Sequence, residues 1–109
     1  MKLLFICSRN RWRSLTADNI FKDLPGYSVR SAGTEAGARV RVTEGLVGWA
    51  DLIFVMEKKH LARLRERFGD VVEEKSVICL HIPDDYEYMD EDLIALLKST
   101  VGEHIDIAE

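Results

Sequence analysis

A cysteine, an arginine and a serine stand close together near the start of the chain, as Cys7, Arg13 and Ser14. A cysteine thiolate is a strong nucleophile, and hydrogen-bond donors or positive charge around it stabilise the thiolate. The planar fork of an arginine binds two oxygens of a phosphate at once, which a lysine cannot do. Ser14 is placed to donate a hydrogen bond to the sulfur. The spacing therefore predicts a cysteine nucleophile that acts on a phosphate held by Arg13.

The segment around these residues is basic, although the chain as a whole is acidic. The net charge is -4 at pH 7, from 15 lysines and arginines against 19 aspartates and glutamates. Arg9, Arg11 and Arg13 nevertheless lie at alternate positions of one short segment. The acidic balance argues against nonspecific binding to nucleic acid, whereas the local cluster of arginines indicates a site for a small anion.

The chain has two cysteines, Cys7 and Cys79, which are too few for a disulfide framework. Neither has neighbours at metal-ligand spacing, so we expect no metal ion and no other cofactor. Cys79 lies within an apolar run and is expected to be a packed core thiol. A cysteine that ends a strand commonly has the same packed role, so the reactive interpretation of Cys7 depends on the loop around it.

The length and hydropathy pattern predict a single domain over residues 1–109. The apolar runs are short and interrupted by charge, so we expect no membrane-spanning segment and no membrane partner. Met1 and Lys2 lead straight into a strand-sized apolar run, without the pattern of a secretion signal. We therefore expect a cytoplasmic location.

Short apolar runs alternate with helical patterns along the chain, which predicts an α/β fold. Strands are expected at 2–6, 27–31, 51–56 and 77–80, and the helices that follow them end near 24, 48, 69 and 101. The second strand is expected at a sheet edge and the other three are expected to be buried. The third helix should end at Gly69 and carry His60 on its surface. Such alternation predicts a doubly wound three-layer sandwich with a four-stranded parallel sheet.

In sheets of this kind the ligand binds beyond the carboxyl ends of the strands. Three segments of the chain are expected there: 7–13, the residues after Ser31, and 81–88. A loop between the first strand and the first helix can turn several backbone N–H groups toward one point. With the helix N-terminus behind them, these donors suit a dianionic phosphate. We therefore predict a phosphate-binding loop after the first strand.

The pattern Cys7-x-x-Asn10-x-x-Arg13-Ser14 after an apolar strand resembles the phosphate loop of the low-molecular-weight protein tyrosine phosphatases. The resemblance continues at 31–34, at 50–56 and at 82–86, where the family's acid loop usually has Asp-Pro. It covers nearly the whole chain, which is shorter than typical members. It implies a metal-independent phosphomonoester hydrolase whose substrate is a phosphorylated protein or a small phosphomonoester. Phosphate, sulfate or vanadate would then bind in the loop.

The resemblance also implies a role for each residue of the site. Cys7 would form a phosphocysteine, Arg13 would bind the phosphoryl oxygens, and Asn10 would hold the loop from a left-handed backbone position. Asp84 is the expected general acid, and Asp85 is the alternative because it stands where the family has proline. The expected substrate-binding residues are Ser8, Arg9, Asn10, Arg11, Trp12, Ser14 and Tyr86, the last as an aromatic flank for a phosphotyrosine ring.

Three departures from the family's pattern concern substrate binding. Arg9 stands where the family usually has glycine, and is either an extra anion contact or an exposed surface residue. Trp12 replaces the second cysteine of many members, so no protective disulfide with Cys7 is expected. Its bulk suits either a core plug or a substrate contact, and the core plug is the favoured interpretation. The connection between Thr34 and Asp51 is shorter than usual. The resemblance therefore implies phosphatase chemistry more strongly than phosphotyrosine specificity.

Other functions stay open at this point. A noncatalytic module that binds phosphate or phosphoproteins would keep the same loop, although the retained Cys7, Arg13 and an available aspartate argue against lost turnover. Arg9, Arg11 and Trp12 would suit a phosphatase acting on a nucleotide or an RNA end, against which the acidic net charge argues. An arsenate reductase with this loop would need further resolving cysteines, and only one other cysteine is present, within a predicted strand.

Overall fold

The structure is a computed structural model that describes residues 1–107. Its four strands are β1 (Lys2–Cys7), β2 (Ser28–Gly33), β3 (Leu52–Val55) and β4 (Ser76–Cys79). Its four helices are α1 (Arg13–Phe21), α2 (Glu44–Trp49), α3 (Lys58–Glu73) and α4 (Glu91–Val101). The strands form one parallel sheet in the order β2-β1-β3-β4. The predicted doubly wound α/β sandwich with a four-stranded parallel sheet is confirmed. Residues 108–109 of the predicted 1–109 domain lie outside the described residues.

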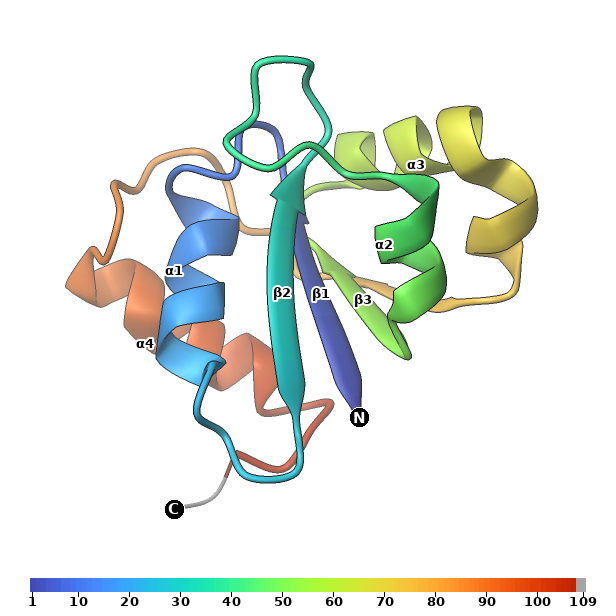
Figure 1. The fold of residues 1–109 in the computed structure, drawn as a ribbon. Coiled ribbons are helices and arrows are strands. Elements are labelled where there is room, and N and C mark those ends of the chain that lie inside the picture. The colour runs from blue at the N-terminus through green and yellow to red at the C-terminus, as the bar shows by residue number, and fades with distance from the viewer. Residues whose placement is uncertain (108–109) are drawn as a thin grey trace.

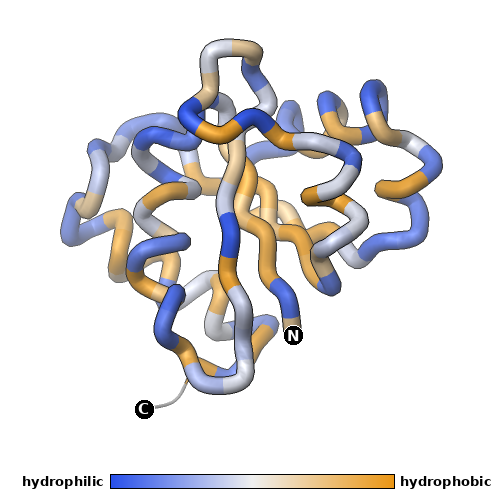
Figure 2. Tube along the Cα trace, viewed as in Figure 1, coloured by the Kyte–Doolittle hydropathy of each residue, from blue (hydrophilic) through white to orange (hydrophobic). Residues whose placement is uncertain are grey.

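Helices cover both faces of the sheet, with α1 and α4 on one side and α2 and α3 on the other (Figure 1). Successive side chains of β1 alternate between the two faces, as a strand requires. Leu3 and Phe5 pack on the side of α1 and α4, whereas Leu4 and Ile6 pack on the side of α2 and α3. This double burial explains why the first strand is apolar at every position after Lys2. Figure 2 shows the apolar colour gathered along the central strands.

The strand order places a topological switch point between β1 and β3. From β1 the chain crosses by α1 to β2 on one side, whereas β3 lies on the other side of β1. Loops that follow β1 and β3 therefore leave the same edge of the sheet in opposite directions, and a crevice opens between them. The loop after β1 begins at Cys7, and the residues after β3 lead into α3.

Side chains at the N-terminal ends fix where α2 and α4 begin. Thr43 Oγ1 accepts a hydrogen bond from the Leu46 backbone N–H at 3.1 Å. The Asp90 carboxylate accepts from the backbone N–H groups of Asp92 and Leu93, at 2.8 and 3.3 Å. Both contacts satisfy N–H groups that a helix cannot pair internally. The start of α4 in turn fixes the end of the loop that follows β4.

Two details of the predicted elements are wrong. The strand expected at 77–80 is not a buried strand, because β4 forms the edge of the sheet and each of its residues is partly or fully exposed. Cys79 is accordingly half-buried rather than a core thiol, and its sulfur lies 3.6 Å from His81 Nδ1. The third helix does not end at Gly69, since α3 continues to Glu73 through non-helical backbone angles at Phe68. The edge position predicted for β2 is confirmed.

No helix among residues 1–107 is both long enough and apolar enough to cross a membrane.

Candidate active site

The loop after β1 is held from outside by the segment that follows β2. The backbone N–H groups of Thr34, Glu35 and Arg39 donate to the carbonyl oxygens of residues 7, 8 and 9, at 3.0, 2.9 and 2.9 Å. These bonds turn three successive carbonyl groups of the loop away from its centre. Among the described residues no acceptor is bound by the backbone N–H groups of Ser8, Arg9, Arg11 and Trp12. The loop is therefore a ring of free donors, which suits an anion.

Two residues with special backbone requirements allow this shape. Asn10 has a φ of 57°, the left-handed conformation that asparagine tolerates better than most residues. Gly33 lies so close to the loop that a Cβ there would be 2.5 Å from the Ser8 carbonyl oxygen. The expected left-handed position of Asn10 is confirmed, and residues 34–39 support the loop through backbone hydrogen bonds.

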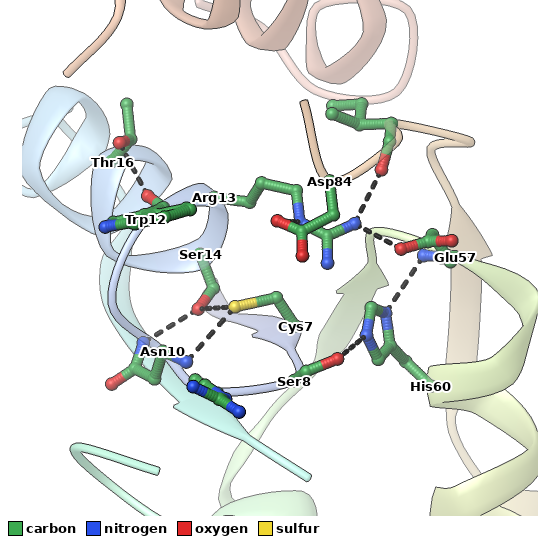
Figure 3. A network of polar contacts seen from close by, with 12 residues as sticks. Cys7, Ser8, Asn10, Trp12, Arg13, Ser14, Thr16, Glu57, His60 and Asp84 are labelled. Carbon is green, nitrogen blue, oxygen red and sulfur yellow. Dashed lines mark hydrogen bonds and ion pairs between the residues drawn. The ribbon is translucent and has the colours of Figure 1, made fainter. Parts of the chain in front are cut away.

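A buried hydrogen-bond network surrounds the sulfur of Cys7 (Figure 3). Asn10 Nδ2 donates to Ser14 Oγ at 2.7 Å, so Ser14 keeps its own proton to donate. The Cys7 sulfur lies 2.9 Å from Ser14 Oγ and 3.2 Å from the Asn10 backbone nitrogen. Both groups can donate to a thiolate, and Cys7 itself lines a cavity. Hydrogen bonds to the charged form of a cysteine stabilise it as nucleophile and as leaving group.

Arg13 begins α1 and is 2% exposed, with its guanidinium held at one end. Its Nη1 donates to a Glu57 carboxylate oxygen at 2.5 Å and to the Ile82 carbonyl oxygen at 2.8 Å. Among the described residues no hydrogen bond engages Nε or Nη2 of this side chain. That edge, whose one ion-pair contact among the described residues is between Nε and Asp84 Oδ1 at 3.6 Å, has the geometry with which arginine binds two oxygens of one phosphate. Burial alone would raise the pKa of Glu57, but the hydrogen bond and charge of Arg13 lower it, so Glu57 stays ionised.

The two aspartates after β4 differ in position. Asp84 lines the cavity above Cys7, with Oδ1 3.6 Å from Arg13 Nε and its side chain 58% exposed. Asp85 is exposed and does not line this cavity. Tyr86 is half-buried, packs against the apolar core on the α1 and α4 side, and is also outside the cavity. The structure therefore brings Asp84 to the expected site, but neither Asp85 nor Tyr86.

His60 is 1% exposed, so its expected position on a helix surface is wrong. The Glu57 backbone N–H donates to His60 Nδ1 at 3.0 Å, which leaves the proton of the neutral ring on Nε2. That nitrogen lies 2.9 Å from Ser8 Oγ and donates to it. Burial, with the nearby positive charge of Arg13, lowers the pKa of His60 to about 4. The ring is therefore neutral at pH 7, and the Ser8 hydroxyl proton is free to point into the cavity that Ser8 lines.

These groups meet in an open cavity of about 400 Å³. Its walls include Cys7, Ser8, Arg9, Arg11, Trp12, Arg13, Glu35, Lys59 and Asp84. Trp12 is 46% exposed at this cavity, so its interpretation as a core plug is wrong. Arg9 is both exposed and a cavity wall, with Nε 3.1 Å from a Glu35 carboxylate oxygen. Among residues 1–107 no cluster of three or more His, Cys, Asp or Glu side chains is arranged to hold a metal ion.

Four residues of the site were not expected from the sequence: Glu35, Glu57, Lys59 and His60. Three of them follow β3, at the switch point of the sheet. The rule that ligands bind beyond the carboxyl ends of strands applies to β3 as it does to β1. Counting that segment among the candidate loops would have drawn attention to Glu57, Lys59 and His60. Glu35 lies in the segment after Ser31, which was expected at this edge, but nothing in the sequence singled it out within that segment.

Comparison with solved structures gives the same architecture at low sequence identity. Over 94% of this chain and 94% of the other, it superposes on the tyrosine phosphatase Wzb from Escherichia coli K30 in complex with phosphate, with a TM-score of 0.76 and 24% identity. With the low-molecular-weight protein tyrosine phosphatase SP-PTP from Streptococcus pyogenes, the TM-score is 0.78 and the identity 16%, over 94% of this chain and 89% of the other. With the YwlE arginine phosphatase from Geobacillus stearothermophilus, the TM-score is 0.70 and the identity 20%, over 94% of this chain and 90% of the other.

No protein-family model and no curated protein sequence matches this chain. The similarity therefore lies in the three-dimensional arrangement of the parallel sheet and its helices. The chain has the fold of the low-molecular-weight protein tyrosine phosphatases.

Proposed function

We propose that the chain hydrolyses phosphomonoesters through a phosphocysteine intermediate on Cys7, with phosphotyrosine in proteins as the substrate class. The observation that carries this proposal is the convergence on one cavity of the Cys7 sulfur, a ring of free backbone N–H groups and the Arg13 guanidinium. Asp84 stands over the same cavity. This set supplies a nucleophile, an anion site and an acid.

In the first step the Cys7 thiolate attacks phosphorus, forming a sulfur–phosphorus bond as the phosphorus–oxygen bond to the leaving group breaks. Asp84, protonated, gives its proton to the departing oxygen. The backbone N–H groups of the loop and the free edge of Arg13 hold the three other phosphoryl oxygens, whose charge they stabilise in the transition state. Ser14 donates to the sulfur while the thiolate exists.

In the second step a water molecule attacks the phosphocysteine. The Asp84 carboxylate accepts a proton from that water, the sulfur–phosphorus bond breaks, and inorganic phosphate leaves. Cys7 returns to a thiolate that Ser14 and the Asn10 backbone N–H again stabilise. The residues that Figure 3 draws together therefore account for both halves of a ping-pong cycle without a cofactor.

The substrate class is supported by the rim of the cavity. Trp12 is an exposed aromatic side chain there, and takes the flanking role that was expected of Tyr86. A phosphotyrosine ring that reaches down to Cys7 would lie beside the indole. Wzb and SP-PTP, which share the fold, are tyrosine phosphatases, whereas YwlE is an arginine phosphatase. Phosphoarginine peptides are accordingly the second substrate to assay.

The test is hydrolysis of p-nitrophenyl phosphate with EDTA present, run for the wild type and for Cys7→Ser. We expect turnover in the wild type that falls by at least ~10³-fold in the variant, because the nucleophile is lost. A wild type that binds phosphate or vanadate but shows no turnover would overturn catalysis and leave the noncatalytic phosphate-binding module. Turnover that EDTA abolishes would contradict a cofactor-free cycle.

The serine variant has one complication, which a solved relative illustrates. A mutant of YwlE is known with a phosphorylated active-site serine. A serine hydroxyl at position 7 would stand in the same loop and could take up phosphate slowly. Cys7→Ala, which offers no acceptor atom, is therefore the cleaner variant wherever a covalent adduct is measured.

A further inference from the structure

A second cavity, of about 560 Å³, adjoins the cavity that contains Cys7. The two cavities share Arg9, Arg11 and Glu35 as walls. The second extends from there across the 34–37 segment toward α3, and three further arginines line it, Arg41, Arg63 and Arg67. The two cavities are therefore neighbours, separated by side chains that line both of them.

The charge of this cavity is opposite to that of the chain. Five of the 15 lysines and arginines line it, but only one of the 19 aspartates and glutamates. That one acid, Glu35, is paired with Arg9. Within residues 1–107, Arg11, Arg41, Arg63 and Arg67 form no ion pair. Like charges gathered without counter-charges repel one another, and a bound anion would relieve that repulsion.

The arginines reach the cavity from three separate parts of the fold. Arg63 and Arg67 stand four residues apart on α3 and so lie on one face of the helix. Arg41 ends the loop after β2, where it forms an isolated parallel bridge with Gly33. Arg9 and Arg11 come from the loop after β1. Arg67 is held in place, since its Nη1 donates to the Thr34 carbonyl oxygen at 3.2 Å and its guanidinium lies over the Phe68 ring. The positive wall is thus a product of the tertiary structure rather than of one basic stretch of sequence.

We propose that this arginine-lined cavity binds a second phosphate of the substrate while the loop at Cys7 holds the phosphate that is hydrolysed. The proposal rests on the phosphatase function proposed above and names the chemical class of its substrate, a bisphosphorylated molecule. Arginine forks bind phosphate oxygens in pairs, which a cavity of several free guanidinium groups favours. A long nucleic acid fits less well, because the acids concentrated on the remaining surface would repel it.

The experiment compares kcat/KM for matched substrates with and without the second phosphate. One arm uses phosphotyrosine peptides that carry phosphoserine or serine one to four residues away. The other arm uses adenosine 3′,5′-bisphosphate beside AMP. In at least one arm the second phosphate should raise kcat/KM by about 10-fold at low salt, by lowering KM rather than by raising kcat. The arm that responds identifies the source of the phosphate, and the gain should shrink as salt screens the charges.

Arg41→Gln combined with Arg63→Gln should reduce the gain to nearly one, because both side chains are exposed on the cavity wall and unpaired. The matched control is Arg30→Gln combined with Arg65→Gln, which removes the same charge from β2 and α3 outside the cavity and should keep the gain. Equal kcat/KM for the matched substrates in the wild type would overturn the proposal. If both double variants lost the gain in kcat/KM equally, the proposal would also be overturned, since such a loss would reflect net charge alone.

Failure of the second site is distinguishable from failure of the phosphatase function. If p-nitrophenyl phosphate is not hydrolysed by the wild type, the phosphatase proposal fails, and binding of inorganic tripolyphosphate then tests the cavity directly by calorimetry. Affinity that falls about 10-fold in the Arg41→Gln, Arg63→Gln variant but not in the control supports the cavity. Equal affinity in the three proteins overturns it. If p-nitrophenyl phosphate is hydrolysed and the second phosphate has no effect, only the second site fails.

Discussion

The floor and the rim of the cavity at Cys7 are built in opposite ways. On the floor, Cys7, Asn10 and Ser14 are buried and hydrogen-bonded to one another. On the rim, Arg11 and Trp12 are exposed, and Arg11 forms no ion pair among residues 1–107. Two residues separate Asn10 from the start of α1, so the change from buried to exposed side chains occurs within the loop itself.

The difference follows from what each region has to do. Buried polar groups are costly unless they are hydrogen-bonded, and hydrogen bonds within the floor hold its members in position, although Asn10 Oδ1 is buried there without a partner among the described residues. Such a floor holds the sulfur in one place, which the proposed attack on phosphorus would need. Exposed arginines cost little to solvate and can adapt to what binds. Changes on the floor should therefore lower kcat or stability, whereas changes on the rim should act on KM.

Arg13→Lys should give the largest effect among changes that keep the charge. The lysine ammonium has only three donors and no planar fork, so it cannot bind two phosphoryl oxygens while it also keeps the contacts with Glu57 and the Ile82 carbonyl. We expect kcat/KM for p-nitrophenyl phosphate to fall by roughly 10²–10³-fold. Circular dichroism would show that the variant is folded. Near-normal activity in a folded Arg13→Lys protein would refute the role of the fork.

The comparison of the two aspartates should separate one catalytic position from a surface position. Asp84→Asn should lower kcat by about 10²-fold, more for phenyl phosphate than for p-nitrophenyl phosphate, because the poorer leaving group needs the proton more. Asp85→Asn should stay within about twofold of the wild type, since Asp85 is exposed and outside the cavity. The reverse pattern would transfer the acid role to Asp85.

His60 should make the stability of the floor depend on pH. Its pKa is lowered to about 4 in the folded chain, chiefly by burial, from an ordinary value of 6.5. The unfolded chain therefore binds the proton first as pH falls. The stabilisation is complete above pH 6.5 and is lost as pH falls toward 4, by about 2 kcal/mol between pH 7 and 4.5. Urea unfolding at the two pH values measures this loss.

The control for that measurement is His60→Gln, whose side-chain amide can still donate toward Ser8 but does not titrate. Carboxylates that do not interact with His60 affect both proteins equally, so the difference between their pH dependences reports the imidazole together with its coupling to Glu57 and Asp84. Parallel loss of stability in wild type and variant would show that His60 is not buried as a neutral ring. His60→Ala, which also loses the hydrogen bond, should be less stable than His60→Gln at pH 7.

Trp12→Ala should give the smallest effect and the one most specific to the rim. The indole is exposed, so its removal should leave stability nearly unchanged. If it flanks the substrate ring, KM for a phosphotyrosine peptide should rise by roughly three- to tenfold while kcat is retained. A large loss of stability in this variant would instead restore the core-plug interpretation that the exposure of Trp12 contradicts.

The parts of the fold that depend on local patterns could be predicted from the sequence. The apolar run of β1, the phosphate loop and the left-handed Asn10 lie within a few consecutive residues, where spacing and residue type carry the information. The position of β4 at an edge could not be predicted, because an edge strand is defined by the absence of a further strand beyond it. Its apolar run reads like that of a central strand.

The parts of the site that depend on distant pairing were missed for a similar reason. Ser8 and His60 lie 52 positions apart in the sequence and meet only because β1 and β3 are adjacent. In a helical pattern with polar neighbours, nothing marks His60 as buried. Trp12 was assigned to the core because large aromatic side chains are usually buried, and its exposure depends on how the loop turns at Asn10.

The most direct test of the phosphocysteine mechanism is mass spectrometry of the protein quenched in acid during turnover of p-nitrophenyl phosphate. Asp84→Asn is the variant to use, because the good leaving group departs with little help while hydrolysis of the intermediate loses its base. The mechanism predicts a phosphate adduct that maps to Cys7 and is absent from the Cys7→Ala, Asp84→Asn double variant. Turnover of the wild type with no adduct on Cys7 in Asp84→Asn, or an adduct that persists in the double variant, would contradict it.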